Sequence, residues 1–268
     1  MLDQELRFSG SVPEKYDRLM VPLLFRPYAE ELASRARAIG PRIVLETAAG
    51  TGVVTEALHE ALPDADIIAT DLNPPMLDLA RQRVGSKRVR FVQADAQDLP
   101  FETGSFDLVL CQFGSMFFPD KVRGHLEARR VLRDGGSYLL AIWDRIERNE
   151  LSNAAQGALI DCFPDDPPRF MAEGPFGYHD TSRIESDLHD AGFDTVDIET
   201  IELRSRASSA HDAATALFYG SPMGVEVEEK SAGSGERVFD AVERALRLFE
   251  GPDGVDAPMA AHIVTASK

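Results

Sequence analysis

The chain has 268 residues, of which 44% are hydrophobic and 27% charged. These values are ordinary for a soluble globular protein and exclude a collagen, a coiled coil and a fully disordered chain. The 28 Lys and Arg residues against 45 Asp and Glu residues give a net charge of −17, which would repel polyphosphate, so we expect no nucleic-acid partner.

The chain begins with a helical pattern. Residues 13–38 are predicted to be helical, and Pro13, Pro22 and Pro27 are expected to break this run into short pieces. We assign residues 1–40 to an N-terminal helical cap segment.

From about residue 42 to residue 143, short apolar runs alternate with helical patterns, as in the βαβ units of a parallel sheet. Each strand is apolar enough to be buried on both faces. The five predicted strands are 42–47, 66–70, 89–94, 106–111 and 137–143. The helices predicted between them are 55–62, 75–84 and 122–132, and Gly135 and Gly136 are expected to end the last one.

The remaining sequence predicts further helices and two strands. The alternating strand suits an exposed edge of the sheet. In chain order these elements are a helix at 150–162, a loop rich in proline and aromatic residues at 163–180, a helix at 182–192, the alternating strand at 193–203, helices near 211–219 and 235–249 separated by a charged loop, and a last strand at 261–267.

Cysteine content and hydropathy indicate the compartment. Cys111 and Cys162 are too few for a disulfide framework or a spaced metal set, so we expect a reducing compartment and no metal. Residues 1–20 lack the basic start and apolar block of a secretory signal, and the most apolar stretch, 108–118, is too short to span a bilayer. We therefore expect a cytoplasmic protein without a membrane partner.

The most informative segment is 44–58, where an apolar strand runs into a turn of small residues and then a helix. Ala48, Ala49, Gly50 and Gly52 would let ligand atoms approach the backbone closely. The unpaired amides of the following helix supply hydrogen-bond donors and a positive dipole end. This arrangement is a candidate nucleotide site, and a tight turn without a ligand is the alternative.

Two aspartates follow the next predicted strands. Asp71 comes 19 residues after Gly52, close to the ~20 expected for a ribose-binding carboxylate. An exposed turn aspartate is the alternative for Asp71. Asp95, after the third strand, would lie at the same edge and could accept the amine of a base, although an Asx turn explains it equally well.

Together these segments resemble the class I S-adenosylmethionine-dependent methyltransferases, particularly the small-molecule branch that includes quinone-biosynthesis enzymes. The resemblance implies an α/β, Rossmann-like, seven-stranded and mostly parallel sheet in the order 3-2-1-4-5-7-6, with an antiparallel last strand, flanking helices and a helical cap. It also implies S-adenosyl-L-methionine as cofactor. The segments that carry it are LETAAGTG (45–52), DLNPPML (71–77), QADAQDLPF (93–101), FDLVLCQFGSMFFPD (106–120) and RRVLRDGG (129–136).

The resemblance also implies roles for the residues of the first two turns. Glu46 and the turn through Ala48, Gly50 and Gly52 would lie beside the methionine and ribose parts of the cofactor, and Asp71 would hold the ribose diol. Many family members have glycine where this chain has Ala48, so its backbone is expected to avoid conformations that only glycine permits.

Further residues are implied to contact the rest of the cofactor. Leu72 and Met76 would sandwich the adenine, Asp95 would accept its amine, and the Ala96 backbone would meet a ring nitrogen. In the same way, the resemblance places other side chains around the methionine end and over the cofactor, namely Gln112, Phe113 and Tyr16.

The sequence thus predicts an enzyme that methylates an O, N or C atom of a small, partly apolar acceptor by in-line displacement. Such a reaction mainly requires alignment of the reactants and exclusion of water. His179 is the candidate general base, with a surface histidine as the alternative. We assign the cofactor-binding core to 41–148, and substrate-cap insertions and the strands that complete the sheet to 149–268. Seven aromatic residues are candidates for the acceptor pocket: Tyr16, Phe25, Phe163, Phe170, Phe176, Tyr178 and Phe218.

Two other functions share this fold logic. An NAD(P)-dependent oxidoreductase would need a third glycine where this chain has Thr55, and Glu46 suits a cationic amino group better than a pyrophosphate. A non-catalytic protein that retains the fold is the third possibility. The Asn-Pro-Pro sequence at 73–75 resembles a motif of nucleic-acid amino methyltransferases, but that motif follows the fourth strand, not the second.

Overall fold

A computed structural model describes residues 12–268. The chain forms two compact units, each assembled from separate segments. The core unit contains Tyr28–Trp143, Tyr178–Ile201 and Ala261–Lys268, and the helical unit contains the residues up to Pro27 together with Asp144–Gly177 and Glu202–Ala260.

The strands form one sheet in the order β3-β2-β1-β4-β5-β8-β6, and the two-residue strand β7 pairs with β8. Strands β1 to β5 pair in parallel, whereas β8 is antiparallel to β5. The predicted order is confirmed, with β8 as the predicted last strand. The strands are β1 (Ile43–Glu46), β2 (Asp66–Asp71), β3 (Val89–Gln93), β4 (Phe106–Gln112), β5 (Leu132–Trp143), β6 (Thr195–Ala207), β7 (Glu250–Gly251) and β8 (Gly254–Ser267).

The winding of the sheet reverses at β1, which lies between β2 and β4. Glu46, the last residue of β1, is opposite Ala69 of β2 and Leu110 of β4. The carboxyl ends of these three parallel strands therefore meet at one edge, where open α/β sheets bind their ligands.

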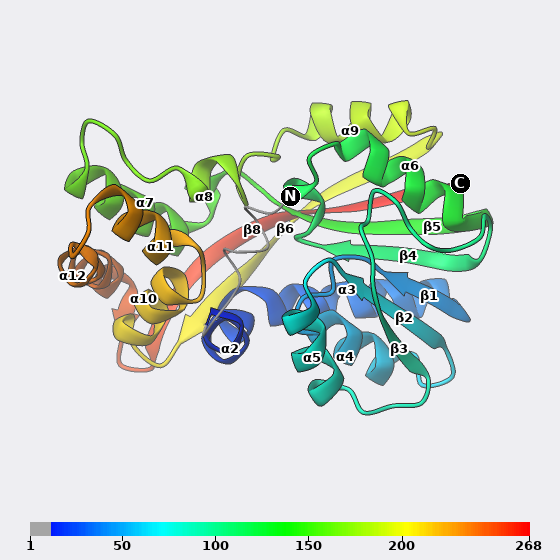
Figure 1. The fold of residues 1–268 in the computed structure, drawn as a ribbon, viewed down its shortest axis with the longest axis horizontal. Helices are drawn as coiled ribbons and strands as arrows, with labels where there is room; N and C mark the ends of the chain where they lie inside the picture. Colours follow the sequence, from blue (N-terminus) through cyan, green and yellow to red (C-terminus); the bar gives the residue numbers. More distant parts are fainter. Residues whose placement is uncertain (1–11) are drawn as a thin grey trace. The chain divides into compact units, whose positions relative to one another are not determined.

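Helices cover both faces of the core unit, giving a three-layered arrangement. Figure 1 shows α6 and α9 on one face of the strands and α4 and α5 on the other. In α4, Val54 and Leu58 are spaced four residues apart and both are buried, as expected for a helix with one apolar face. The helices of this unit are α3 (Arg26–Ile39), α4 (Val53–Ala61), α5 (Pro74–Arg83), α6 (Lys121–Val131), α9 (Thr181–Asp190) and the short turn η2 (Ser115–Phe117).

The helical unit is built around α12, which packs against α7 and α10 through buried Val238, Val242 and Leu246. None of the helices within residues 12–268 has the length and apolarity needed to cross a membrane. The helices of this unit are α2 (Val12–Lys15), η1 (Tyr16–Phe25), η3 (Ile146–Arg148), α7 (Glu150–Cys162), α8 (Phe170–Glu173), α10 (Ala210–Tyr219), α11 (Met223–Lys230), α12 (Gly235–Leu246) and η4 (Arg247–Phe249).

The N-terminal prolines do not break the helical run as predicted. Residues 12–39 are helical without a gap, and the backbone remains helical at Lys15 and Arg26, where one helix passes into the next. Pro22 lies inside the π-helical segment η1. The wider π turn leaves more room for the ring of Pro22, which in an α-helix would clash with the carbonyl group four residues earlier.

Two strand predictions also need correction. Gly135 and Gly136 do not end the preceding helix, because α6 stops at Val131 and both glycines lie in β5. Strand β3 is not buried on both faces, since it is the end strand of the sheet and exposes Arg90 and Gln93.

The segments expected to be loops contain helices. The charged loop between the last two predicted helices holds α11, which buries Met223 and Val227 on one side. Its many glutamates hide this single apolar stripe in the sequence. The proline-rich loop 163–180 likewise contains the single-turn helix α8.

Candidate active site

Glu46 is the buried carboxylate at the end of β1, with its side chain held from α4. The Thr55 hydroxyl donates to Glu46 Oε2 at 2.6 Å, and both residues are almost wholly inaccessible. The Thr70 hydroxyl of β2 donates to the Glu46 carbonyl at 3.0 Å. The carboxylate therefore has a fixed position at the edge where three strands end.

Burial raises the pKa of Glu46 to about 8. The hydrogen bond from Thr55 opposes this rise, and the neighbouring charge of Asp71 adds to it. A carboxylate in such surroundings is stabilised by a cation placed beside it. The site is therefore suited to a ligand that carries a positive charge.

Asp71 connects the turns that follow β1 and β2. Its Oδ2 accepts from the Gly50 amide and its Oδ1 from the Asn73 amide, both at 2.8 Å. Burial raises the pKa of Asp71, while the backbone donors oppose the rise. Each carboxylate oxygen can accept more than one hydrogen bond, so Asp71 can brace the turns and still accept from a hydroxyl.

Ala48 lies in the left-handed region with φ +53°, contrary to the prediction that its backbone avoids glycine-like conformations. This region is open to L residues at a cost of about 1–2 kcal/mol. Its methyl group fits because residue 114 is glycine, where a Cβ would lie 2.4 Å from the Ala48 Cβ. The turn is thus strained at Ala48.

Glycine is required at position 52 by the backbone conformation and by the packing of α5. Its φ is +82°, and a Cβ there would lie 2.8 Å from Ala80 Cβ of α5. The glycine therefore allows α4 to start close to α5, whatever contact its backbone makes with a ligand.

The turn after β4 is also strained and is surrounded by aromatic rings. Gln112 is half-buried at the strand end, and Phe113 has φ +53°. The Phe113 ring lies flat on Trp143, with ring centroids 3.8 Å apart, and Tyr28 meets both rings edge-on. Ala48 and Phe113 are the two non-glycine residues with positive φ in residues 12–268, and they follow adjacent strands.

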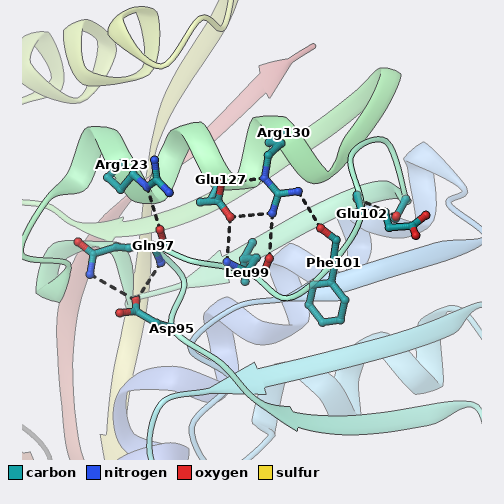
Figure 2. A network of polar contacts seen from close by, with 9 residues as sticks. Asp95, Gln97, Leu99, Phe101, Glu102, Arg123, Glu127 and Arg130 are labelled. Carbon is teal, nitrogen blue, oxygen red and sulfur yellow. Dashed lines mark hydrogen bonds and ion pairs between the residues drawn. The ribbon is translucent and has the colours of Figure 1, made fainter.

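Asp95 forms an Asx turn, which was one of the two alternatives that the sequence predicted for it. Its Oδ1 accepts from the Gln97 amide at 2.9 Å and from Gln97 Nε2 at 3.3 Å (Figure 2). Ala96 beside it is half-buried. The turn does not exclude a ligand, because a carboxylate has a second oxygen that can accept a hydrogen bond.

The adenine candidates on the second turn differ in exposure. Leu72 is half-buried, and its carbonyl accepts from Gln93 Nε2 at 3.0 Å. Met76 is buried on α5, with 5% of its surface exposed.

The two remaining predicted residues come from other segments of the chain. Tyr16 belongs to the helical unit and stacks on Phe25, with centroids 5.1 Å apart. His179 has an exposed side chain, and its carbonyl accepts from His262 Nε2 of β8 at 3.0 Å. Four of the seven aromatic acceptor candidates are buried as packing residues: Phe25, Phe176, Tyr178 and Phe218.

The sequence analysis missed several residues that shape the core unit. Thr55 was noted only as the absence of a glycine, yet its hydroxyl holds Glu46. His125 is fully buried between the hydroxyls of Tyr138 and Tyr178, and this burial lowers its pKa to about 4. No sequence pattern signals such contacts, because they depend on the tertiary structure.

Solved structures with the same fold support the assignment of architecture. A methyltransferase from Bacillus halodurans, described as putative, aligns with a TM-score of 0.58 and 20% identity over 88% of this chain and 97% of that one. The YcgJ protein of Bacillus subtilis aligns with a TM-score of 0.59 and 18% identity over 90% of this chain and 99% of that one. At these identities the likeness shows the fold, which is the Rossmann-like methyltransferase fold.

Sequence comparison identifies a methyltransferase domain in part of the chain. Residues 44–136 match the model of a methyltransferase domain. A demethylmenaquinone methyltransferase of Deinococcus radiodurans is 41% identical over 136 residues, 49% of this chain and 56% of that protein. One of Thermus thermophilus is 38% identical over 137 residues, 48% of this chain and 60% of that protein. The chain thus matches little more than half the length of these relatives. Residues 44–136 thus match a methyltransferase domain, and this part of the chain is similar to methyltransferases whose methyl donor is S-adenosyl-L-methionine.

Proposed function

We propose that this protein transfers a methyl group from S-adenosyl-L-methionine to an O, N or C atom of a small, partly apolar organic molecule. The observation that carries this proposal is the pair of acidic side chains, Glu46 and Asp71, fixed at one sheet edge where β1 and β2 end.

The residues at this edge fit the cofactor chemically. Glu46 is buried with a raised pKa, so a ligand ammonium group would stabilise its carboxylate. Asp71 is braced by two amides and retains lone pairs for the ribose diol. The backbone of Ala48, Gly50 and Gly52 would lie along the ligand between these carboxylates.

We further propose contacts for the remaining parts of the cofactor. Leu72 and Met76 would flank the adenine, and Asp95 and the Ala96 amide would bind its polar edge. The rest of the proposed set consists of Gln112 and Phe113 at the methionine end, with Tyr16 as a cover. The support for these contacts is the resemblance to the family, together with the position of Leu72, Asp95, Ala96, Gln112 and Phe113 at or just after strand ends.

The reaction mainly requires the protein to align the methyl donor with the acceptor and to exclude water from the site. When bound, the cofactor supplies a methyl group bonded to a sulfonium sulfur. This sulfur is a good leaving group because it departs as a neutral thioether. The strained Phe113 backbone is held by a hydrogen bond from its amide to the Ala141 carbonyl at 2.9 Å, and its ring stacks on Trp143. These rings would exclude water beside the methyl group, and His179 is proposed as the base for an acceptor that must lose a proton.

The names of the relatives suggest the acceptor class. The D. radiodurans and T. thermophilus proteins are demethylmenaquinone methyltransferases, so we infer a quinone-type ring as the first acceptor to examine. The two free cysteines favour a reducing compartment, and we propose the cytoplasm as the location.

A turnover assay tests the proposed function. The full chain is incubated with S-adenosyl-L-methionine and a panel of reduced quinones, phenols and amines, and S-adenosylhomocysteine is quantified by mass spectrometry. We expect product with at least one acceptor and loss of about 90% or more of the rate in Glu46→Gln. Cofactor binding without product from any acceptor would favour the non-catalytic alternative.

A further inference from the structure

The segment after β3 is held by side chains of α6 instead of a neighbouring strand. The Leu99 amide donates to Glu127 Oε2 at 2.8 Å, and the Leu99 carbonyl accepts from Arg130 Nη2 at 2.9 Å. The Phe101 carbonyl accepts from Arg130 Nη1 at 2.7 Å. Figure 2 shows both side chains reaching from α6 to this segment, residues 95–101, which we call the β3 loop.

A second set of contacts holds the start of the β3 loop. The Gln97 carbonyl accepts from Arg123 Nε at 3.0 Å, and Gln97 Oε1 accepts from the Asp120 amide at 2.9 Å. Gln97 in turn donates twice to Asp95. Arg123, Glu127 and Arg130 are four and three residues apart and so share one face of the helix. The position of Asp95 is therefore coupled to α6 through Gln97.

Glu127 and Arg130 form a two-bond ion pair. Arg130 Nε lies 2.8 Å from Glu127 Oε1, and Nη2 lies 2.7 Å from Oε2. The Arg130 guanidinium lowers the pKa of Glu127, so the carboxylate stays ionised at neutral pH. Charge-assisted, two-pronged contacts of this kind fix geometry as well as energy. Loss of one partner leaves the other, and the loop groups it binds, without compensation.

We propose that Glu127 and Arg130 are positioning residues that set the cofactor's base specificity. They hold the β3 loop so that Asp95 and the Ala96 amide face the polar edge of adenine, although neither residue touches the cofactor. This inference rests on the proposed function, because it assumes that the β3 loop binds adenine. It adds a source of specificity that lies outside the binding residues.

The preference of the protein for adenine over hypoxanthine tests most directly whether Glu127 and Arg130 position the β3 loop. Adenine presents an amine that Asp95 can accept, whereas hypoxanthine presents a carbonyl that a carboxylate repels. Dissociation constants for S-adenosylhomocysteine and S-inosylhomocysteine are measured by calorimetry. We expect the wild type to prefer the adenine ligand by about tenfold or more.

Three variants weaken the clamp, by which we mean the contacts of Arg123, Glu127 and Arg130 with the β3 loop, and a fourth variant leaves it intact. In Glu127→Gln and Arg130→Lys we expect about fivefold weaker binding of S-adenosylhomocysteine and a preference for adenine reduced to about threefold. Arg123→Ala changes an exposed residue, so it keeps the fold, and is expected to show the same change at about half the size. Arg133→Ala is the matched control, because it removes an arginine paired with Asp107 at 2.8 Å outside the β3 loop.

Hydrogen exchange provides a test without cofactor. The Leu99 amide should exchange faster in Glu127→Gln and Arg130→Lys than in the wild type or Arg133→Ala, because its acceptor is weakened or displaced. Wild-type protein that binds neither ligand would contradict the proposed function itself. Wild-type protein that prefers adenine, with all three clamp variants retaining that preference, would overturn the positioning role.

Discussion

The Thr55 hydroxyl on α4 donates a 2.6 Å hydrogen bond to the buried Glu46 carboxylate at the end of β1. Position 55 is where the dinucleotide-binding pattern requires a glycine. Thr55 therefore places a hydroxyl group, hydrogen-bonded to Glu46, at the position where the oxidoreductase pattern has glycine. The contact also explains why the acid is held in place although burial disfavours its charge.

Glu46→Gln is expected to stabilise the protein without ligand at alkaline pH. The folded-state pKa of Glu46, about 8, is above its ordinary value, so the folded state retains a proton that the unfolded state has lost. Stability then falls as pH rises from about 4.5 to about 8. Chemical denaturation at pH 5 and pH 8.5 should show this decline in the wild type and a smaller decline in Glu46→Gln.

Glu60→Gln, an exposed change on the same helix, is the control and should retain the wild-type decline. The same Glu46→Gln protein should bind S-adenosyl-L-methionine about tenfold or more weakly, since the ammonium loses its counter-charge. Equal pH dependence of stability in Glu46→Gln and the wild type would contradict the electrostatic account of this site.

Gly52→Ala should destabilise the fold more than Gly40→Ala. Both glycines have positive φ, +82° and +69°, but a Cβ at Gly52 meets Ala80 whereas a Cβ at Gly40 meets nothing within 4 Å. Backbone strain costs about 1 kcal/mol in each, and the clash should add about 1–3 kcal/mol at Gly52. Urea unfolding of both variants measures the difference, and Ala80→Gly should recover part of it. Equal losses in the two variants would show that close packing is not the reason for Gly52.

Trp143 should report ligand binding by fluorescence. It is the one tryptophan in the sequence, and its ring stacks on Phe113, which we propose to lie beside the methionine end. We expect S-adenosylhomocysteine to change the emission with the dissociation constant found by calorimetry. Phe113→Leu removes the stack and should cost about 0.5–1.5 kcal/mol beyond its lost area. Unchanged emission at saturation would place the ligand away from this turn.

His179→Ala tests the proposed base. If His179 accepts a proton from the acceptor, the variant should lower kcat about 100-fold and remove the acid limb of the pH–rate profile. Thr181→Ala, on the same exposed segment, should leave the profile as it is. A wild-type profile in His179→Ala would exclude this histidine from the mechanism, leaving alignment alone to drive the transfer.

The core unit was largely predictable because its signals are local. Strands β1, β2 and β4 are short apolar runs bounded by turn residues, and α5 begins and ends within one residue of its predicted bounds. The spacing from Gly52 singled out Asp71, and the resemblance to the family singled out Glu46, before their geometry was known.

Other features depend on tertiary contacts and could not be predicted. The positive φ of Ala48 becomes acceptable because Gly114, far along the chain, leaves room for its methyl group. The hydrogen bond from the Leu99 amide to Glu127 joins residues 28 positions apart. The helical pattern of α6 does not indicate this contact. Pro22 likewise looked like a helix breaker because a wide helical turn leaves no sequence signature.

The measurement that bears most directly on the account is calorimetric titration of the full chain with S-adenosyl-L-methionine, S-adenosylhomocysteine and NAD. We predict micromolar binding of the first two, no binding of NAD, and about tenfold or greater weakening in Asp71→Ala, with the folded state of the variant checked by its unfolding temperature. Micromolar binding of NAD, with none of either sulfur-containing ligand, would contradict the account and favour an oxidoreductase.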